Sequence, residues 1–226
     1  MKLVALDTST EYFCLGISDG EKVLLKERIL LERKHSTHLL PILRDGLKRH
    51  RLSIQEIDGF IVGLGPGSFT GLRVGISMAK AMAFSLKKPV VGVPTLDCLA
   101  EAVPQNGIQI APLIDAKREQ VYAALYERKN GLLHKKIKER VTPPASFLKD
   151  LRTETLFLGG GTTLYREKIV EVLGERALFT DPTYDIPDPA TLLSLGRIRF
   201  AKKRFEDLGT LVPLYLYPKD CMIRKE

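Results

Sequence analysis

The sequence predicts an α/β protein made of two similar halves, and three observations carry the prediction. Each half opens with three apolar runs of strand length. In each half a turn that ends in glycine joins the second run to the third. Each half then repeats a short apolar run, a glycine-rich loop and a helix. A repeat of roughly 100 residues is much longer than the repeats of solenoid proteins, so it indicates a duplicated domain.

In the first half, strands are predicted over residues 3–7, 12–18 and 23–30. Asp19-Gly20 lies between the last two, and this pair is a strong signal for a β-hairpin. A helix is predicted from Ser36 or Thr37 to about His50, with Pro41 requiring a late start or a kink. Further predicted elements are a strand over 60–64 and helices over 76–86 and 95–103.

In the second half, strands are predicted over residues 110–115, 120–126 and 132–141, with an Asn130-Gly131 turn before the last. The run 155–161 repeats the strand and glycine loop. Helices are predicted after Pro143-Pro144 and over 162–173. A last helix is predicted from 188 to 205, because Asp at the cap and Pro at the first helical position favour helix initiation. Asn106-Gly107 marks the division into lobes 1–104 and 108–226, and the last helix and tail are candidates for packing back on the first lobe.

The segment from Gly65 to Gly75 reads GPGSFTGLRVG and lies between a predicted strand and a predicted helix. Such an arrangement can direct backbone N–H groups at an anion. However, the segment lacks the lysine of a phosphate-binding P-loop, and its glycines are spaced differently from those of a dinucleotide-binding loop. Two interpretations therefore stay open: an unusual anion-binding loop, or a means of bringing helices close together.

The helix that follows the loop favours close packing. Gly71, Gly75, Ala79 and Ala83 recur every four residues and form one stripe of small side chains, which allows close approach of a neighbour. The other faces are also mostly apolar, so the helix is either buried in the core or partly covered by a partner protein. If a partner covers the stripe, Gly75→Arg should abolish partner binding and preserve folding; if the stripe faces the chain's own sheet, the variant should unfold.

Composition describes a globular protein of 226 residues with 44% hydrophobic and 27% charged residues. The first residues are too short an apolar run for a secretory leader, and no run approaches the length of a membrane span, so no membrane association is expected. The three cysteines are scattered, which suggests reduced thiols and a cytoplasmic location. They are Cys14, Cys98 and Cys221.

The net charge of +8 suits a polyanionic partner. Basic residues concentrate in Lys117-Arg118 and in the runs 128–140 and 197–204. Direct binding of tRNA through the second-half hairpin, with Lys135, Lys136 and Lys138, is one interpretation; a solvated basic surface is the other. No aromatic-rich RNA motif is present to decide between them.

Four segments resemble one known family, and together the resemblance covers essentially the whole chain. They are Asp7-Thr8-Ser9-Thr10, the segment Gly65–Gly75, the run 91–96 (VGVPTL) and the run 114–122 (IDAKREQVY). The family is TsaB, also called YeaZ, of tRNA threonylcarbamoyladenosine biosynthesis. The resemblance implies a two-lobed actin-like ATPase (ASKHA) fold with duplicated mixed-sheet lobes and flanking helices.

The resemblance further implies a non-catalytic subunit that activates a related catalytic subunit, TsaD, which transfers threonylcarbamoyl from threonylcarbamoyl-AMP to N6 of the adenosine 3′ of the anticodon in tRNA. Implied partners are TsaD, the ATPase TsaE, a second copy of this chain when TsaD is absent, and tRNA through the complex. TsaB proteins pair through helices that correspond to residues 36–49 and 70–86. The implied partner-binding residues are Leu39, Leu40, Leu43, Leu47, Gly71, Leu72, Gly75, Ile76, Ala79, Met82 and Ala83.

Catalytic chemistry is not expected in this chain. TsaD binds its metal with two histidines, and the resemblance places Thr95 and Leu99 at those positions, neither of which is a suitable ligand. We therefore expect no catalytic residue, no metal and no cofactor, with ATP and the metal ion held by partner subunits. His35 and His38 lie three residues apart, but no third ligand is evident. A vestigial nucleotide site remains open at Asp7, Thr8, Ser9, Asp115, Gly159 and Gly160.

One alternative function stays open at this point. The chain could be an enzyme in its own right, either an ATP-binding phosphotransferase or a metallopeptidase of the glycoprotease type. This alternative requires Mg-ATP or a metal to bind the isolated chain.

Overall fold

The computed structural model describes the backbone of residues 1–31 and 35–217, and the side chains of the same residues except 35–37. The predicted helix cap at Ser36 or Thr37, the side chain of His35 and Cys221 therefore lie outside the described part. The structure divides into two compact units. Unit 1 consists of residues 1–98 and 186–213, and unit 2 of residues 99–185 and 214–226.

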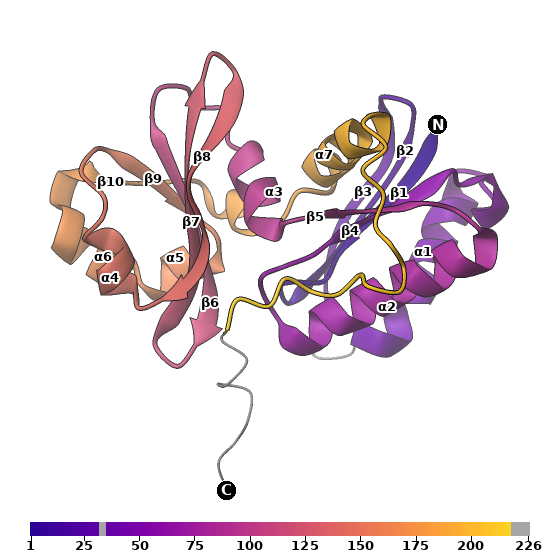
Figure 1. The fold of residues 1–226 in the computed structure, drawn as a ribbon, viewed down its shortest axis with the longest axis horizontal. Coiled ribbons are helices and arrows are strands. Elements are labelled where there is room, and N and C mark those ends of the chain that lie inside the picture. The colour runs from indigo at the N-terminus through magenta and orange to yellow at the C-terminus, as the bar shows by residue number, and fades with distance from the viewer. Residues whose placement is uncertain (32–34, 218–226) are drawn as a thin grey trace, which may run out of the picture. The chain divides into compact units, whose positions relative to one another are not determined.

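Unit 1 is built on a five-stranded mixed sheet (Figure 1). Its strands are β1 (Lys2–Asp7), β2 (Tyr12–Asp19), β3 (Lys22–Leu30), β4 (Gly59–Gly63) and β5 (Val90–Val93), in the order β3-β2-β1-β4-β5. β1, β2 and β3 pair antiparallel, whereas β1, β4 and β5 pair parallel. The three-strand meander follows from the Asp19-Gly20 turn, in which Gly20 has a φ of 57°.

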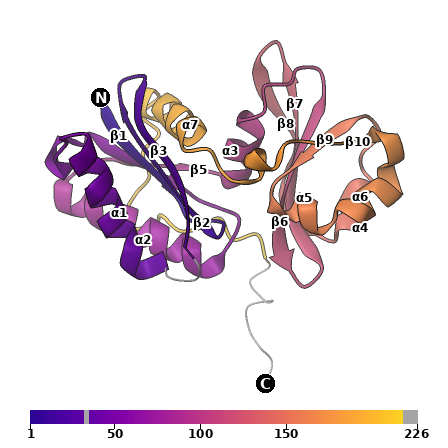
Figure 2. The ribbon, with the colours of Figure 1, turned by 180° about the vertical axis from the view of Figure 1, so that it is seen from behind.

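Helices cover both faces of this sheet (Figure 2). α1 (His35–Arg49) and α2 (Phe69–Leu86) lie on one face, and α7 (Pro189–Ala201) lies on the other. Because side chains alternate along a strand, Val4 and Leu6 of β1 pack toward α1 and α2, while Leu3 and Ala5 pack toward α7. This two-sided burial explains why β1 is a continuous apolar run.

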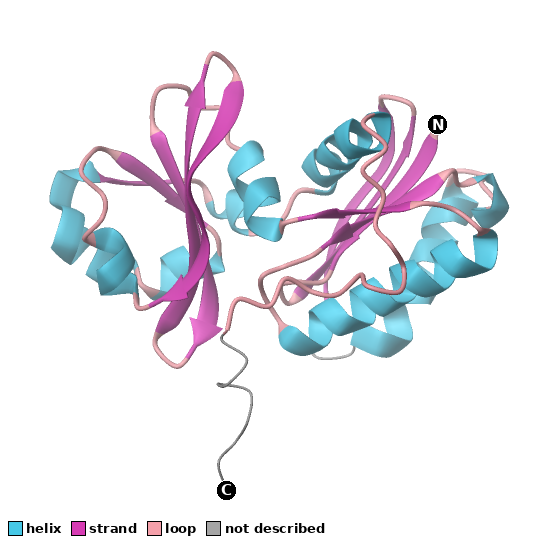
Figure 3. Ribbon diagram, viewed as in Figure 1, coloured by secondary structure: helices cyan, strands magenta, loops and turns pink. Residues whose placement is uncertain are grey.

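Unit 2 repeats the architecture (Figure 3). Its strands are β6 (Gln109–Lys117), β7 (Gln120–Lys129), β8 (Leu132–Thr142), β9 (Thr155–Leu158) and β10 (Ala177–Phe179), in the order β10-β9-β6-β7-β8. α4 (Pro144–Leu148), α5 (Gly160–Leu164) and α6 (Arg166–Leu173) accompany it. Their core includes Phe147, Phe157 and Ile169, each fully buried. α3 (Thr95–Glu101) spans the division between the units, which falls after Cys98.

The two sheets have the same topology, so the predicted duplication is confirmed. β6 to β10 repeat β1 to β5 in order and in pairing direction: two antiparallel pairs are followed by two parallel pairs. All six predicted strands of the two meanders form within three residues of the predicted ends, the largest difference being at the end of β7. The architecture is the predicted duplicated actin-like ATPase fold.

Several details differ from the sequence-based predictions. α2 begins at Phe69 rather than near residue 76, so most of the expected glycine loop is helical. The helix predicted over 162–173 is two helices, α5 and α6, and α7 ends at Ala201 rather than near 205. The short strands β5 and β10 were not predicted. The segment 105–107, expected to separate the lobes, lies inside unit 2. The last helix, α7, does belong to unit 1, as expected for a helix that packs back on the first lobe.

Candidate functional site

The end of β1 carries a completely buried carboxylate, Asp7. One carboxylate oxygen, Oδ1, accepts hydrogen bonds from the backbone N–H of Ser9 at 2.7 Å and from its hydroxyl at 2.5 Å. The other, Oδ2, accepts one from the Thr95 hydroxyl at 2.8 Å. Gly63 leaves room for the carboxylate, because a Cβ there would lie 1.9 Å from Oδ2. Both oxygens of Asp7 are therefore engaged within unit 1.

The glycine-rich segment closes over the loop that follows Asp7. Ser68 donates its backbone N–H to the carbonyl of Ser9 at 2.7 Å, and Thr8 donates its hydroxyl to the carbonyl of Gly71 at 2.8 Å. Cβ atoms at Gly67 and Gly71 would lie 2.1 Å and 2.2 Å from the carbonyl oxygens of Ser9 and Thr8. The glycines thus allow backbone to contact backbone, and Ser68, with its side chain accepting from the Gly71 N–H, caps α2.

Burial raises the pKa of the Asp7 carboxyl, and the hydrogen bonds from Ser9 and Thr95 oppose that shift. A carboxylate in this state has no exposed oxygen to offer a magnesium ion. Thr8 and Ser9 are also buried, at 1% exposure each. The three predicted nucleotide-binding residues of unit 1 are therefore brought together, but they bond to their own chain.

The predicted nucleotide-binding residues of unit 2 lie around the end of β6 and the start of α5. Asp115 accepts from the Lys117 N–H at 2.8 Å and from its ammonium group at 2.6 Å. Gly159 donates its N–H to Asp185 at 2.7 Å, so this N–H is already bonded within unit 2. Gly160 is exposed, and a Cβ there would meet no atom within 4 Å.

The positions compared with metal-binding histidines hold side chains with other roles. Thr95 donates to Asp7, and Leu99 is 1% exposed within the apolar interior. Among the described residues, no group of three His, Cys, Asp or Glu side chains is placed to hold a metal ion. Cys14 and Cys98 are free and buried, and burial raises the pKa of both thiols well above the usual value. No described helix is long and apolar enough to cross a membrane.

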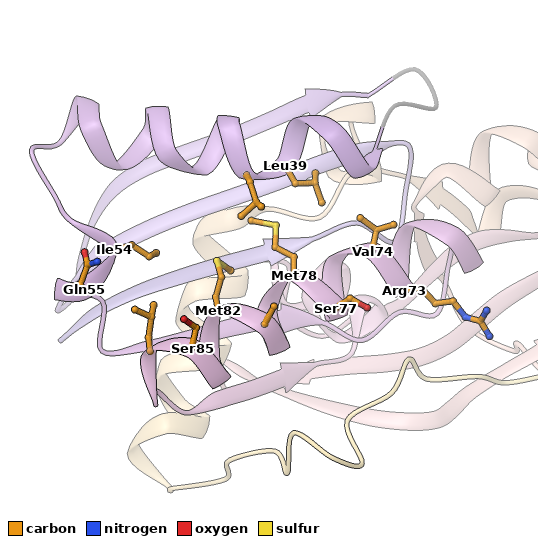
Figure 4. Close-up of a pocket in the computed structure, with 12 residues that line it drawn as sticks. Leu39, Ile54, Gln55, Arg73, Val74, Ser77, Met78, Met82 and Ser85 are labelled. Atoms are coloured by element: carbon orange, nitrogen blue, oxygen red, sulfur yellow. The ribbon is translucent and has the colours of Figure 1, made fainter.

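An apolar groove lies between α1 and α2 (Figure 4). Its volume is about 700 Å³. Leu39 of α1 and Met78 and Met82 of α2 point into it, and Arg73 lies at one end. Leu40, at its margin, is 58% exposed. The remaining lining residues are Ile54, Gln55, Val74, Ser77, Ala81, Ser85 and Leu86.

Most residues predicted to bind a partner are buried in the interior of unit 1. Only Leu40 is exposed and Met82 partly exposed; the rest are buried. The stripe of small residues faces the chain's own sheet and loop, since a Cβ at Gly75 would lie 2.2 Å from the Thr8 hydroxyl oxygen. Of the two interpretations of this stripe, the structure shows the internal one. The expectation that Gly75→Arg preserves folding is therefore wrong, because the larger side chain has no space.

The surface that α2 exposes was missed in the sequence. Ser77, Ala81 and Ser85 also recur every four residues, and all three are exposed along the groove. The two stripes lie on opposite sides of one helix. The signal that separates them is glycine content, because glycine is required where backbone meets backbone, while Ser and Ala suffice at a surface.

Comparisons with known proteins agree with this geometry. Residues 29–225 match the family model described as TsaD: tRNA N6-adenosine threonylcarbamoyltransferase. Two curated relatives, each named tRNA threonylcarbamoyladenosine biosynthesis protein TsaB, come from Bacillus subtilis (32% identical) and Escherichia coli (36% identical). Each alignment covers 96% of this chain and 94% of the relative.

Solved structures give the same result. YeaZ from Pseudomonas aeruginosa is 28% identical, with a TM-score of 0.79, and the alignment covers 95% of this chain and all of that one. The ethanolamine utilization protein EutJ from Carboxydothermus hydrogenoformans, at 11% identity and a TM-score of 0.50, shares the fold alone. On sequence similarity over nearly its whole length and on the duplicated fold, this chain belongs to the TsaB (YeaZ) family of tRNA threonylcarbamoyladenosine biosynthesis proteins.

Proposed function

We propose that this chain is the non-catalytic subunit of a bacterial assembly that transfers threonylcarbamoyl from threonylcarbamoyl-AMP to N6 of the adenosine 3′ of the anticodon in tRNA. Its role is to bind and activate a TsaD-like catalytic subunit, which with a TsaE-like ATPase supplies the metal ion and ATP. In the absence of the catalytic subunit the chain pairs with a second copy of itself. The location is the cytoplasm.

The observation that carries the proposal is the contrast between two regions of unit 1. The acidic end of β1 is closed: both oxygens of Asp7 are engaged, and the loop 8–9 is buried under α2. The groove between α1 and α2 is open and lined mainly by apolar side chains. A closed acidic site favours a non-catalytic role, and an open apolar groove favours a protein partner.

The groove suits a helix from the partner. Met78 and Met82 are flexible enough to adapt to another apolar surface. Because Ser77, Ala81 and Ser85 have small side chains, a second helix can approach the exposed side of α2 closely. The catalytic subunit and the second copy of this chain are proposed to use the same groove and therefore to compete for it.

The test is Ala81→Arg in the full chain, with the TsaD-like subunit of the same organism coexpressed. Ala81 is exposed on a helix, so the variant should fold with an unchanged melting temperature. A large charged side chain in the centre of the groove should weaken partner binding by roughly thirtyfold or more, equivalent to about 2 kcal/mol. Copurification and titration calorimetry measure this, and light scattering measures self-association.

Ala201→Arg is the matched control, because Ala201 is also an exposed helical alanine but lies at the end of α7, away from the groove. It should bind the partner as the wild type does. If Ala81→Arg binds the partner as tightly as the wild type does, the groove is not the partner-binding site. The alternative of an independent phosphotransferase or metallopeptidase receives no support from the engaged Asp7.

A further inference from the structure

Two basic turns lie at the end of unit 1 that is opposite to Asp7. The first, Lys87-Lys88, joins α2 to β5. The second, Lys202-Lys203-Arg204, follows α7. All are exposed except Lys88, which is partly exposed. We refer to these five residues as the basic edge.

The two turns are held side by side by contacts of the residues next to them. Phe200, near the end of α7, fills the space above Gly59, where a Cβ would also lie 3.1 Å from the carbonyl oxygen of Pro89. Glu206 then donates its backbone N–H to the carbonyl of Val90 at 2.8 Å. Lys87-Lys88 directly precedes Pro89, and Lys202-Lys203-Arg204 lies between Phe200 and Glu206. The two basic turns are therefore neighbours, and their five cations are exposed or partly exposed.

The nearest acidic side chains in the sequence are directed at backbone groups. Glu206 Oε1 accepts from the Gly92 N–H at 3.3 Å, and Asp207 Oδ1 accepts from the Thr210 N–H at 2.9 Å. No ion pair links a cation of the basic edge to any acidic side chain within the described ranges. The positive charge of this edge is thus left to interact with solvent or with a partner.

The basic hairpin of unit 2 is different. Lys129 and Lys136 both pair with Glu127, at 3.0 Å and 3.4 Å. Lys135 pairs with Glu139, and Arg140 with Asp150. The hairpin cations are therefore largely balanced by carboxylates of unit 2, which weakens the interpretation that the hairpin binds tRNA.

An aromatic ring adjoins the basic edge. Phe205 is 47% exposed and packs edge-on against Phe200, with ring centroids 5.4 Å apart. Cations beside an exposed aromatic ring suit nucleic acid, because phosphates bind the cations and an unpaired base can stack on the ring. A lipid surface is less well suited, since the cations lie on two turns and not along an amphipathic helix.

We propose that the basic edge binds the phosphate backbone of the tRNA that the assembly modifies, so that this subunit contributes to substrate binding as well as to activation. The inference rests on the proposed function, because it is the assembly that brings the tRNA. The contact is independent of sequence, since backbone phosphates carry no base identity.

The experiment compares two triple variants that change the net charge equally. One reverses the basic edge (Lys202→Glu, Lys203→Glu, Arg204→Glu), and the other reverses the hairpin (Lys129→Glu, Lys136→Glu, Lys138→Glu). Affinity for an unmodified tRNA transcript is measured against salt concentration, for the full chain and for its complex with the TsaD-like subunit. Capture of that subunit and the melting temperature are recorded for each variant.

The basic-edge triple should weaken tRNA binding by about tenfold or more and reduce the slope of log affinity against log salt by about 2, since each lost phosphate contact removes roughly 0.7–0.9. It should capture the catalytic subunit normally, and the hairpin triple should bind tRNA nearly as the wild type does. Failure of the wild type to capture the catalytic subunit would count against the proposed function, while the tRNA comparison on the chain alone still tests the basic edge.

Unchanged tRNA affinity in the basic-edge triple would overturn the inference, whether or not the hairpin triple loses affinity. If the same triple also loses binding to vesicles of phosphatidylserine and phosphatidylcholine, the basic edge is assigned to lipid headgroups.

Discussion

Asp7 is the residue at which a nucleotide site and a structural role can be told apart. The sequence left a vestigial nucleotide site open at this residue. Here the acid is fully buried and bonds to Ser9 and Thr95. The hydroxyl of Thr95 donates to Asp7 and so joins the start of α3 to the end of β1. The carboxylate is part of the internal packing of unit 1.

Lowering the pH should make the wild type more stable relative to the Asp7→Asn variant. Its folded pKa is raised above the ordinary value of 3.8 because burial disfavours the ionised form. Folding therefore favours proton uptake at this group, and its contribution to stability is present below pH 3.8 and is lost as the pH rises through the folded pKa. In Asp7→Asn this titration is absent.

The measurement is urea unfolding of both proteins between pH 7 and pH 4. The free energy of unfolding of the wild type should rise relative to that of Asp7→Asn as the pH falls. A difference that moves in the opposite direction would mean that the hydrogen bonds from Ser9 and Thr95 outweigh burial in setting the Asp7 pKa.

At the scale of elements, α2 packs against the rest of unit 1 with one side and lines the groove with the other. The side with Gly71, Gly75, Ala79 and Ala83 packs inside unit 1, and the side with Ser77, Ala81 and Ser85 lines the groove. Two hydrogen bonds to the loop 8–9 fix the start of the helix: the Thr8 hydroxyl donates to the carbonyl of Gly71, and the Ser68 N–H donates to the carbonyl of Ser9. A rigidly placed α2 is what a proposed docking surface needs, since less freedom is lost on binding.

Gly75→Ala should destabilise the protein by about 1–3 kcal/mol, because the added methyl group would lie 2.2 Å from the Thr8 hydroxyl oxygen and must displace it. At an ordinary helical position the same substitution stabilises by about 1 kcal/mol, so the sign is diagnostic. Chemical denaturation measures the change. Ser77→Ala, half a turn along on the exposed side, is the control and should change stability by less than about 0.5 kcal/mol. A Gly75→Ala protein more stable than the wild type would contradict this prediction, because it would show that the loop 8–9 moves aside without loss of stability.

At the scale of the whole molecule, the chain returns to unit 1 after residue 185, and residues 186–213 belong to that unit. The segment after α7 runs past β5 and α2 (Figure 1). Glu206 forms hydrogen bonds with the backbone of Val90 and Gly92 in β5. β5 is the edge strand of the sheet, so these bonds satisfy backbone groups on its outer side. Lys80 of α2 then donates to the carbonyl of Leu211, whose side chain is 5% exposed within the main core.

Leu211→Ala should therefore cost about 2 kcal/mol or more, through lost burial and the cavity that remains. Its neighbour Val212 is 59% exposed, and Val212→Ala should be close to neutral. Thermal and urea unfolding of the two variants provide the measurement. Equal effects at both positions would show that the returning segment is not part of the core of unit 1.

The sequence alone determined the repeat, the two meanders and the family, because these depend on local signals: two-residue periodicity, turns with glycine, and an uncommon motif. It did not determine β5 and β10, since short buried strands carry too few residues to show a period. It also did not give the true start of α2, because a glycine-rich run resembles a loop until a capping serine and tertiary contacts make it helical.

Spacing alone could not choose between the two sides of α2, and apart from the glycines of one stripe the choice was made by tertiary structure. Both stripes have the same spacing and small side chains, and periodicity says nothing about which side meets the sheet. The same holds for the charges: the sequence contains basic runs in both halves, but pairing with Glu127 and Glu139 neutralises one while the other stays exposed. Spacing along a chain is local information, whereas burial and charge pairing depend on residues distant in sequence that folding brings together.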